Sequence, residues 1–158
     1  MAIALFGAGS MTHAEAATTT VQASVKVVKS LSLTAKQSLD FGTVLLSGAP
    51  SSSSVSLSGT GIVTCGPGLT CSGAARPAIF NVQGSNAQTV QIFAVPSDLT
   101  NPADGAKLRF TPSAPASVTL TNSGAPGKDF NIGGSIDIPS TTSDGTYTGN
   151  VEVTVDYQ

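Results

Sequence analysis

The last stretch of the chain, residues 145–158, is the sequence feature that most constrains the fold. Polar residues alternate there with apolar ones, and the apolar positions include Tyr147, Val151, Val153, Val155 and Tyr157. A period of two places the apolar side chains on one face of a β-strand. Because no later strand follows in this sequence, we expect another segment to pair with the strand's free edge, since an exposed apolar edge promotes aggregation.

The composition favours an all-β protein with many turns. Charged residues make up 10% of the chain, aromatic residues 5%, and Trp is absent. Strands are expected at residues 38–44, 55–64, 77–83, 88–95, 107–111, 118–121 and 130–138, with a Ser-rich surface loop at 48–54. Short strands separated by Gly, Asn and Pro turns, without a helical stretch, indicate one antiparallel β-sandwich domain, here residues 34–158.

The first sixteen residues are similar to the end of a secretory signal. Residues 2–11 form an apolar run that is too short to span a bilayer. Ala14, Glu15 and Ala16 form a small-x-small cleavage site. We therefore expect residues 1–16 to be removed and the exported protein to begin at Ala17. The alternative is that these residues form an ordinary buried N-terminal strand.

Two cysteines, Cys65 and Cys71, flank a Gly-Pro-Gly turn. In an exported protein, two cysteines this close together most simply form a disulfide. A metal site is not expected, because the single His, His13, lies within the predicted signal. The acidic stretch 98–105 has oxygen ligands that calcium would accept, but it lacks the spacing of a known calcium loop, so a surface turn is the preferred interpretation.

The chain offers little for catalysis or nucleic-acid binding. Without His in the expected exported chain, Ser-His and Cys-His nucleophiles are excluded. The carboxylates are scattered, and no Gly-rich phosphate loop opens a helix. The net charge of −2 leaves no basic patch for nucleic acid or for an anionic membrane. We therefore expect neither an enzyme nor a protein with a small-molecule cofactor.

A second alternating stretch lies at residues 17–33. Its apolar positions are Val21, Ala23, Val25 and Val27, and the pattern resumes at Leu31 and Leu33 after a break at Lys29. The break indicates a bulge or the mouth of a groove.

Several motifs together resemble a known family. SLDFGTV at residues 38–44, the small cysteine loop and GTYTGNVEVTVDY at residues 145–157 resemble bacterial secreted pilin-like proteins of the spore-coat-U type. These are subunits of archaic chaperone–usher pili, and the chain resembles most an uncharacterised family of exported pilin-like domains that is related to them. The resemblance implies an immunoglobulin-like sandwich that lacks its last strand and so exposes a hydrophobic groove. It also implies that a periplasmic chaperone fills this groove until, at an outer-membrane usher, the N-terminal extension of the next subunit replaces it.

The two alternating stretches fit this scheme as donor and acceptor. The expected donor residues are Val21, Ala23, Val25, Val27, Leu31 and Leu33. The expected acceptor residues are Phe41, Tyr147, Val151, Val153, Val155 and Tyr157. Head-to-tail contacts that do not close produce a filament, so the expected function is that of a pilus or fibre subunit at the cell surface, with identical or related subunits as partners.

The alternative is that residues 17–33 pair within their own sheet. The protein would then be a secreted monomeric binding module or adhesin. Sequence periodicity does not separate the two cases, because a strand reads the same whether it pairs in cis or in trans.

Overall fold

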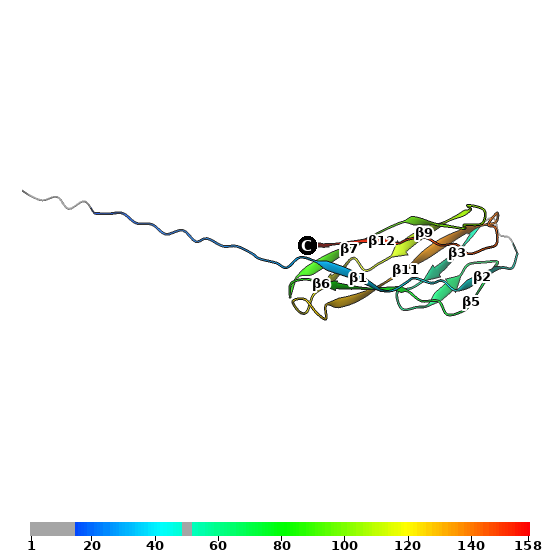
Figure 1. Cartoon of the computed structure of the whole chain (residues 1–158), viewed down its shortest axis with the longest axis horizontal. Coiled ribbons are helices and arrows are strands. Elements are labelled where there is room, and N and C mark those ends of the chain that lie inside the picture. The colour runs from blue at the N-terminus through cyan, green and yellow to red at the C-terminus, as the bar shows by residue number, and fades with distance from the viewer. Residues whose placement is uncertain (1–14, 49–51) are drawn as a thin grey trace, which may run out of the picture.

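The computed structural model describes residues 15–48 and 52–158, and Figure 1 shows an elongated domain with a long N-terminal tail. Most of the predicted signal, residues 1–14, lies outside the described residues. The strands are β1 (Ser32–Gln37), β2 (Thr43–Leu46), β3 (Ser52–Leu57), β4 (Val63–Cys65), β5 (Leu69–Ser72), β6 (Ala78–Gln83), β7 (Thr89–Val95), β8 (Ser97–Thr100), β9 (Lys107–Ser113), β10 (Ser117–Thr119), β11 (Lys128–Pro139) and β12 (Glu152–Tyr157). Across the described ranges there is no helix long and apolar enough to span a membrane.

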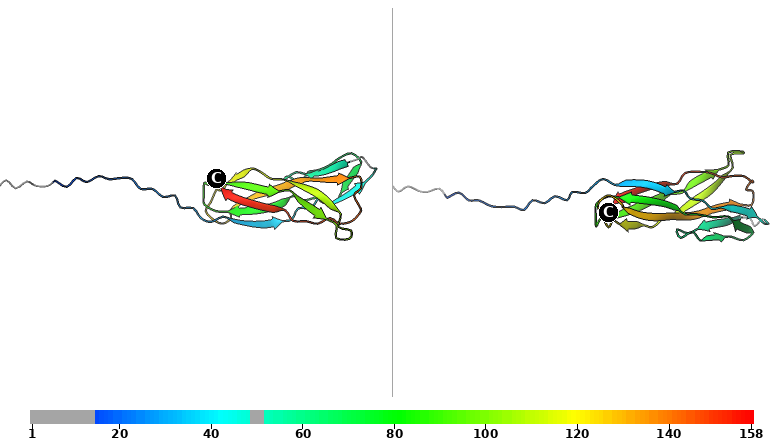
Figure 2. Two further views of the ribbon diagram at one scale, coloured as in Figure 1. Left: turned by 90° about the horizontal axis from the view of Figure 1, so that it is seen from above. Right: turned by 60° about the horizontal axis from the view of Figure 1, so that its bottom comes forward.

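The strands form an antiparallel β-sandwich, as the sequence predicts (Figure 2). The larger sheet has the order β1-β6-β11-β3-β4, and the smaller sheet has the order β10-β7-β12. The long strand β11 is central, because its first part pairs with β6 and its second part pairs with both β3 and β9. Strand β8 extends the larger sheet beyond β9, and β2 and β5 form a separate two-stranded sheet.

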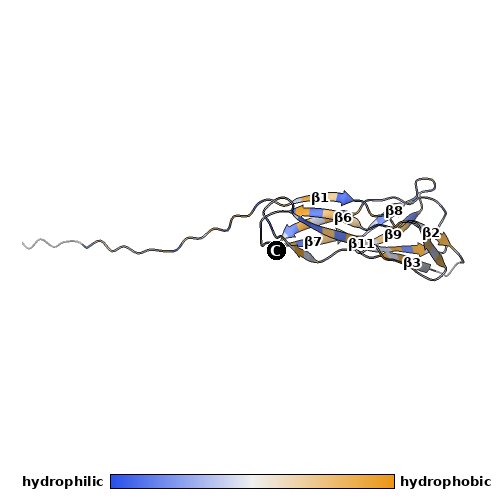
Figure 3. Ribbon diagram, turned by 90° about the horizontal axis from the view of Figure 1, so that it is seen from below, coloured by the Kyte–Doolittle hydropathy of each residue, from blue (hydrophilic) through white to orange (hydrophobic). Residues whose placement is uncertain are grey.

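Two hydrophobic clusters fill the sandwich. The first cluster is centred on Val82, Val90 and Ile132, and the second on Val55 and Phe110, all of them fully buried. Leu39 packs against both. Figure 3 shows hydrophobic residues along β6, β7, β9 and β11, the strands that supply these clusters. The alternation within β9 and β11 thus becomes burial of every second side chain.

Several strands differ from the sequence-based expectation. Ser52–Ser54, expected in a loop, pair with β11, because backbone groups form the ladder whatever the side chain. The expected strand 55–64 is two strands, since a turn at residues 58–62 reverses the chain. Strands β5 and β8 were not expected at all, and β8 lies where the sequence predicts a surface turn. The last strand covers Glu152–Tyr157 only.

The N-terminal tail also differs from expectation. Between residue 15 and Ser32 the structure has no strand, and residues 17–31 of the predicted strand 17–33 pair with none of the described strands. Figures 1 and 2 show the tail leaving from the end of the domain where the C-terminus lies. We call this end the tail pole and the opposite end, with β2 and β5, the far pole. The folded domain therefore begins near Leu31, slightly before the expected boundary at residue 34.

Candidate functional site

An apolar groove of about 740 Å³ lies beside β2, the strand at the far pole. One wall is the segment 39–46, which includes β2, and the other is the segment 142–151, which precedes β12. Buried residues of the second cluster, Phe110 and Ile136 among them, close the groove from below. The floor of the groove is therefore part of the second hydrophobic cluster, and neither wall covers this part of the cluster.

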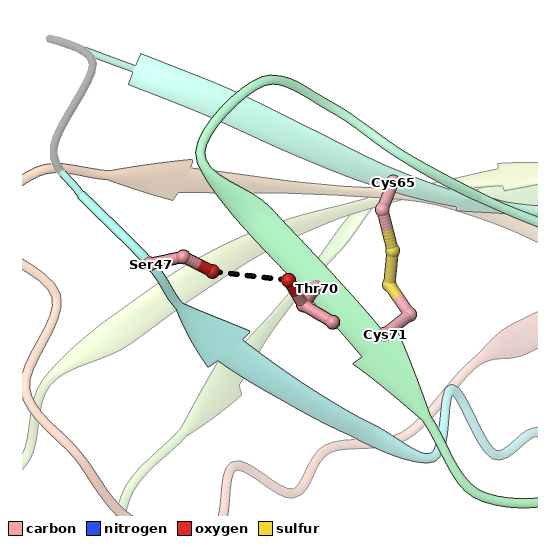
Figure 4. Close-up of a disulfide and its surroundings, with 4 residues drawn as sticks. All are labelled: Ser47, Cys65, Thr70 and Cys71. Carbon is pink, nitrogen blue, oxygen red and sulfur yellow. Dashed lines mark hydrogen bonds between the residues drawn. A yellow bond between two sulfur atoms is a disulfide. The ribbon is translucent and has the colours of Figure 1, made fainter.

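The β2 wall is attached to the domain through a disulfide. Among the described residues β2 pairs only with β5, and β5 pairs only with β2. Figure 4 shows Cys71 of β5 bonded to Cys65 of β4, with the two Cα atoms 6.2 Å apart. The hydroxyls of Ser47, the residue after β2, and Thr70 of β5 lie 3.0 Å apart and add a link at the end of this strand pair. Because β4 belongs to the larger sheet, the predicted disulfide connects the groove wall to the body of the domain.

The opposite wall is held by the hydroxyl of Tyr147. This hydroxyl donates to the backbone carbonyl of Ser143 at 2.8 Å and lies 3.0 Å from Ser143 Oγ. Ser143 Oγ in turn donates to the carboxylate of Asp104. That hydrogen bond, together with one from the Ala106 N–H, holds the pKa of Asp104 below its usual value. The network fixes the Tyr147 ring at the rim of the groove.

A buried Asn completes this wall. Asn101 is 2% exposed, and its Nδ2 donates to the carbonyl of Asp144 at 3.2 Å. Its Oδ1 accepts from the N–H of Ala103 at 3.0 Å. Asn101 thereby joins the β8–β9 turn to the segment that carries Tyr147. Nothing in the sequence distinguishes it from an ordinary turn Asn.

The acidic stretch 98–105 has structural roles. Asp98 pairs with Lys107 at 3.7 Å and with Arg109 at 3.3 Å. Asp104 Oδ1 accepts from the backbone of Ala106 at 2.9 Å. No group of three or more His, Cys, Asp or Glu residues within the described ranges is placed to hold a metal ion.

One edge of β12 has no partner strand among the described residues, because β12 pairs with β7 alone. The N–H of Gln158 donates to the carbonyl of Thr89, which places the even-numbered residues of β12 in the β7 ladder. Alternation then directs the N–H and C=O groups of Val153 and Val155 toward the free edge. The apolar side chains on this strand are only half-buried.

The expected acceptor residues divide into two groups. Phe41, Tyr147 and Val151 line the groove, whereas Val153, Val155 and Tyr157 pack against the first cluster, nearer the tail pole. The sequence analysis missed Leu45 and Leu46, which lie on the β2 wall with exposed fractions of 62% and 46%. Their strand lacks alternation, so no sequence signal marked them.

The expected donor residues also divide. Val21, Val25 and Val27 are 90%, 86% and 84% exposed, and Ala23 is exposed as well. In contrast, Leu31 and Leu33 pack against the first cluster of their own domain, and Leu33 pairs with Val82 of β6. This corrects the expectation for these two leucines, because their side chains are already occupied in cis.

A family comparison fits this division of the chain. A family described as a domain of unknown function, DUF4402, matches residues 31–157. The chain belongs to this family. The matched part of the DUF4402 domain begins at Leu31, the residue at which packing against the core begins, so the exposed tail lies outside it. Comparisons with curated proteins and with solved structures found no match.

Proposed function

We propose that this protein is the structural subunit of a surface fibre and that residues 17–28 of one copy fill the groove of the next. The observation that carries the proposal is that one chain holds both an exposed alternating apolar segment and an open apolar groove, one wall of which, residues 142–151, leads into the strand β12 with its unpaired edge. The exposed apolar side chains of the tail need a surface to cover them, and the open groove needs apolar side chains to fill it. β-strand addition of this kind combines backbone hydrogen bonds with side-chain pockets.

Burial of the tail would supply a substantial driving force. Three exposed valines at roughly 1.5–3 kcal/mol each give about 5–9 kcal/mol on full burial. Each new ladder hydrogen bond adds about 0.5–1.5 kcal/mol. Because the tail forms no strand in its own domain, no intramolecular ladder has to break before it pairs with a neighbour.

The polar faces of the two segments also match. When the apolar tail residues point into the groove, Lys26 lies on the outer face with Thr20, Gln22 and Ser24. The outer face of β12 carries Glu152 and Asp156. The opposite charges favour this pairing, although exposed ion pairs contribute little energy.

The direction of insertion follows from the two poles. Strand β12 runs toward the tail pole. A donor strand antiparallel to β12 runs toward the far pole, so its own domain continues beyond the far pole of the acceptor. This arrangement produces a head-to-tail filament in which each tail pole meets a far pole.

Export belongs to the same proposal. The likeness of residues 1–16 to a secretory signal supports passage to the periplasm. A periplasmic chaperone that shields the groove and an outer-membrane usher follow from the resemblance to pilin-like proteins. The final location would be a fibre on the cell surface.

A pair of tail variants tests the proposal. In the exported full-length protein, Val25→Asp places a charge on the face that enters the groove, and Gln22→Asp places the same charge on the outer face. We expect wild type and Q22D to form SDS-resistant ladders that dissociate on heating, and V25D and a protein lacking residues 17–28 to remain monomeric. Monomeric wild type, or identical ladders for V25D and Q22D, would contradict the proposal. A stable wild-type monomer would favour the binding-module alternative.

A further inference from the structure

Three residues at the tail pole hold the base of the tail, and we call them the tail clamp: Lys29, Ser85 and Tyr157. The Tyr157 hydroxyl donates to the carbonyl oxygen of Lys29 at 2.7 Å and accepts from the N–H of Ser85 at 2.8 Å. The N–H of Lys29 donates to Ser85 Oγ at 2.6 Å. Both backbone polar groups of Lys29 are therefore fixed, one by β12 and one by the turn after β6.

The clamp is positioned by the packed core. The Tyr157 ring and Leu31 both pack against the first cluster. Gly84 lies between them, and a Cβ there would overlap the Tyr157 hydroxyl and approach Leu31 Cδ2 to 2.8 Å. The absence of a side chain at residue 84 thus lets the hydroxyl reach Lys29. Tyr157 was expected to line the acceptor groove, but its hydroxyl holds the chain's own tail.

The clamp also fixes the direction in which the tail leaves. From Lys29, β1 runs toward the far pole and the tail runs the opposite way, out of the domain (Figure 1). To reach its own groove, the tail would have to reverse beside Lys29 and run back along β1. A turn that leaves Lys29 in place would have to use the residues at 25–28, and these include the apolar residues that the groove requires.

Self-insertion is the natural competitor of fibre formation. A tethered segment has an effective concentration of about 1 mM when its linker is short and flexible. At about 1 μM protein, insertion in cis would therefore be favoured roughly a thousandfold over insertion from a second copy, if the two bound forms were equally stable. A chain that polymerises through such a tail needs a feature that opposes the reversal.

We propose that Tyr157 is a specificity-determining residue that opposes self-insertion and keeps the groove open for the tail of a second copy. This inference rests on the proposed function. Two elements of the fold enforce it: the hydroxyl holds Lys29, and the direction of β1 separates the base of the tail from the groove by the length of a strand. Loss of the hydroxyl leaves the Lys29 carbonyl without this hydrogen bond and the Lys29 N–H held by Ser85 Oγ alone, so the chain turns more easily at Lys29.

The test uses the full-length exported protein with Tyr157→Phe, which keeps the ring and removes the hydroxyl. Ser85→Ala removes the other side-chain contact with Lys29 and serves as a second variant if Y157F folds poorly. Ser123→Ala is the matched control, because Ser123 Oγ accepts from Asn86 in the same region without contacting Lys29. The probe is a synthetic peptide of residues 17–28, and the readouts are hydrogen exchange of residues 17–28 in the monomer fraction and peptide binding to that fraction.

We expect Y157F and S85A to accumulate a monomer in which exchange of the tail amides slows roughly tenfold or more. That monomer should not bind the peptide, whereas wild-type and S123A monomers should bind it and keep a rapidly exchanging tail. A tail that exchanges equally fast in Y157F, S85A and wild type overturns the role of the clamp, whatever the ladder length. Failure of wild-type monomer with an exposed tail to bind the peptide refutes the proposed function instead, and the clamp proposal with it.

Discussion

Two adjacent glycines show how single residues set the geometry of the sheet. Gly133 and Gly134 lie where β11 is flanked by both β3 and β9. A Cβ at Gly133 would overlap the carbonyl oxygen of Leu57, which is backbone and does not move aside. The close approach of β3 carries Val55 and Leu57 into the core. The floor of the groove therefore depends on the absence of a side chain at residue 133.

Gly133→Ala should lower the free energy of unfolding by about 1–3 kcal/mol, because overpacking shifts the backbone of β3. Gly59→Ala is a suitable control, since the nearest atom to a Cβ there lies at an ordinary contact distance of 3.6 Å. Denaturant unfolding of both variants measures the difference. Equal stability of G133A and wild type would show that β3 does not approach β11 this closely.

The Lys36–Asp129 ion pair secures the edge strand β1. Lys36 Nζ lies 2.7 Å from Asp129 Oδ2, and it lowers the pKa of Asp129, with a further contribution from the Asn81 amide. An Asp with a lowered pKa in the folded state stabilises the fold above its unfolded pKa of about 3.9. This stabilisation is lost as the pH falls through the folded-state pKa.

Hydrogen exchange therefore provides a pH test of this pair. Relative to its intrinsic rate, exchange in β1 should accelerate as the pH falls below about 4, and Lys36→Met should remove most of that dependence. Lys26→Met, in the exposed tail, is the control. The same acceleration in K36M as in wild type would assign the pH effect to other carboxylates.

At the scale of elements, the sequence pattern predicts some of the strands around the groove and not others. The alternation ending in Val153, Val155 and Tyr157 correctly predicted a half-buried last strand. Strands β5 and β8 escaped notice because LTCS and SDLT are short and lack a large apolar face. The same alternation marks Val27 and Leu33, yet only Leu33 packs in cis. Sequence periodicity predicts which side chains share one face of a strand. Tertiary contacts decide what that face packs against.

The disulfide should matter more for the groove than for global stability. The Cys65→Ser, Cys71→Ser double variant removes a short loop closure, which contributes about 2 kcal/mol in the chain-entropy estimate. The β2–β5 sheet pairs with no other described strand, so its wall should loosen and the affinity for a peptide of residues 17–28 should fall more than tenfold. Thermal unfolding and peptide titration measure the two effects. Unchanged affinity in a folded variant would contradict this role.

The two edges of β12 should respond differently to proline, because one edge bonds to β7 and the other has no partner among the described strands. Thr154→Pro removes an N–H that bonds to β7, leaves a carbonyl unpaired, and should cost about 1–3 kcal/mol of stability. Val153→Pro removes an N–H that points to the free edge, so it should destabilise less and chiefly weaken pairing with an incoming strand. Unfolding and ladder formation are the measurements. A larger loss of stability in V153P than in T154P would reverse the assignment of the free edge.

At the scale of the whole molecule, the domain has two different poles. The tail leaves from one, where Tyr157 holds Lys29, and β2, which forms a wall of the groove, lies at the other. The sequence predicted the sandwich, the disulfide and the two alternating ends. It did not predict the Tyr157 contact, because Lys29 and Tyr157 are 128 residues apart and neither belongs to a motif that links them. The division between tail and domain therefore required the three-dimensional arrangement.

The most direct measurement is the binding of a synthetic peptide of residues 17–28 to protein that lacks those residues. Among the described residues, the hydrogen bonds and core packing of the domain begin at Lys29 and Leu31, so the shortened protein should fold. The account predicts saturable binding and a melting temperature that rises with peptide concentration, both abolished by Val25→Asp in the peptide and preserved by Gln22→Asp. Absence of binding, or equal binding of the V25D and Q22D peptides, would contradict the claim that the tail fills the groove of a second copy.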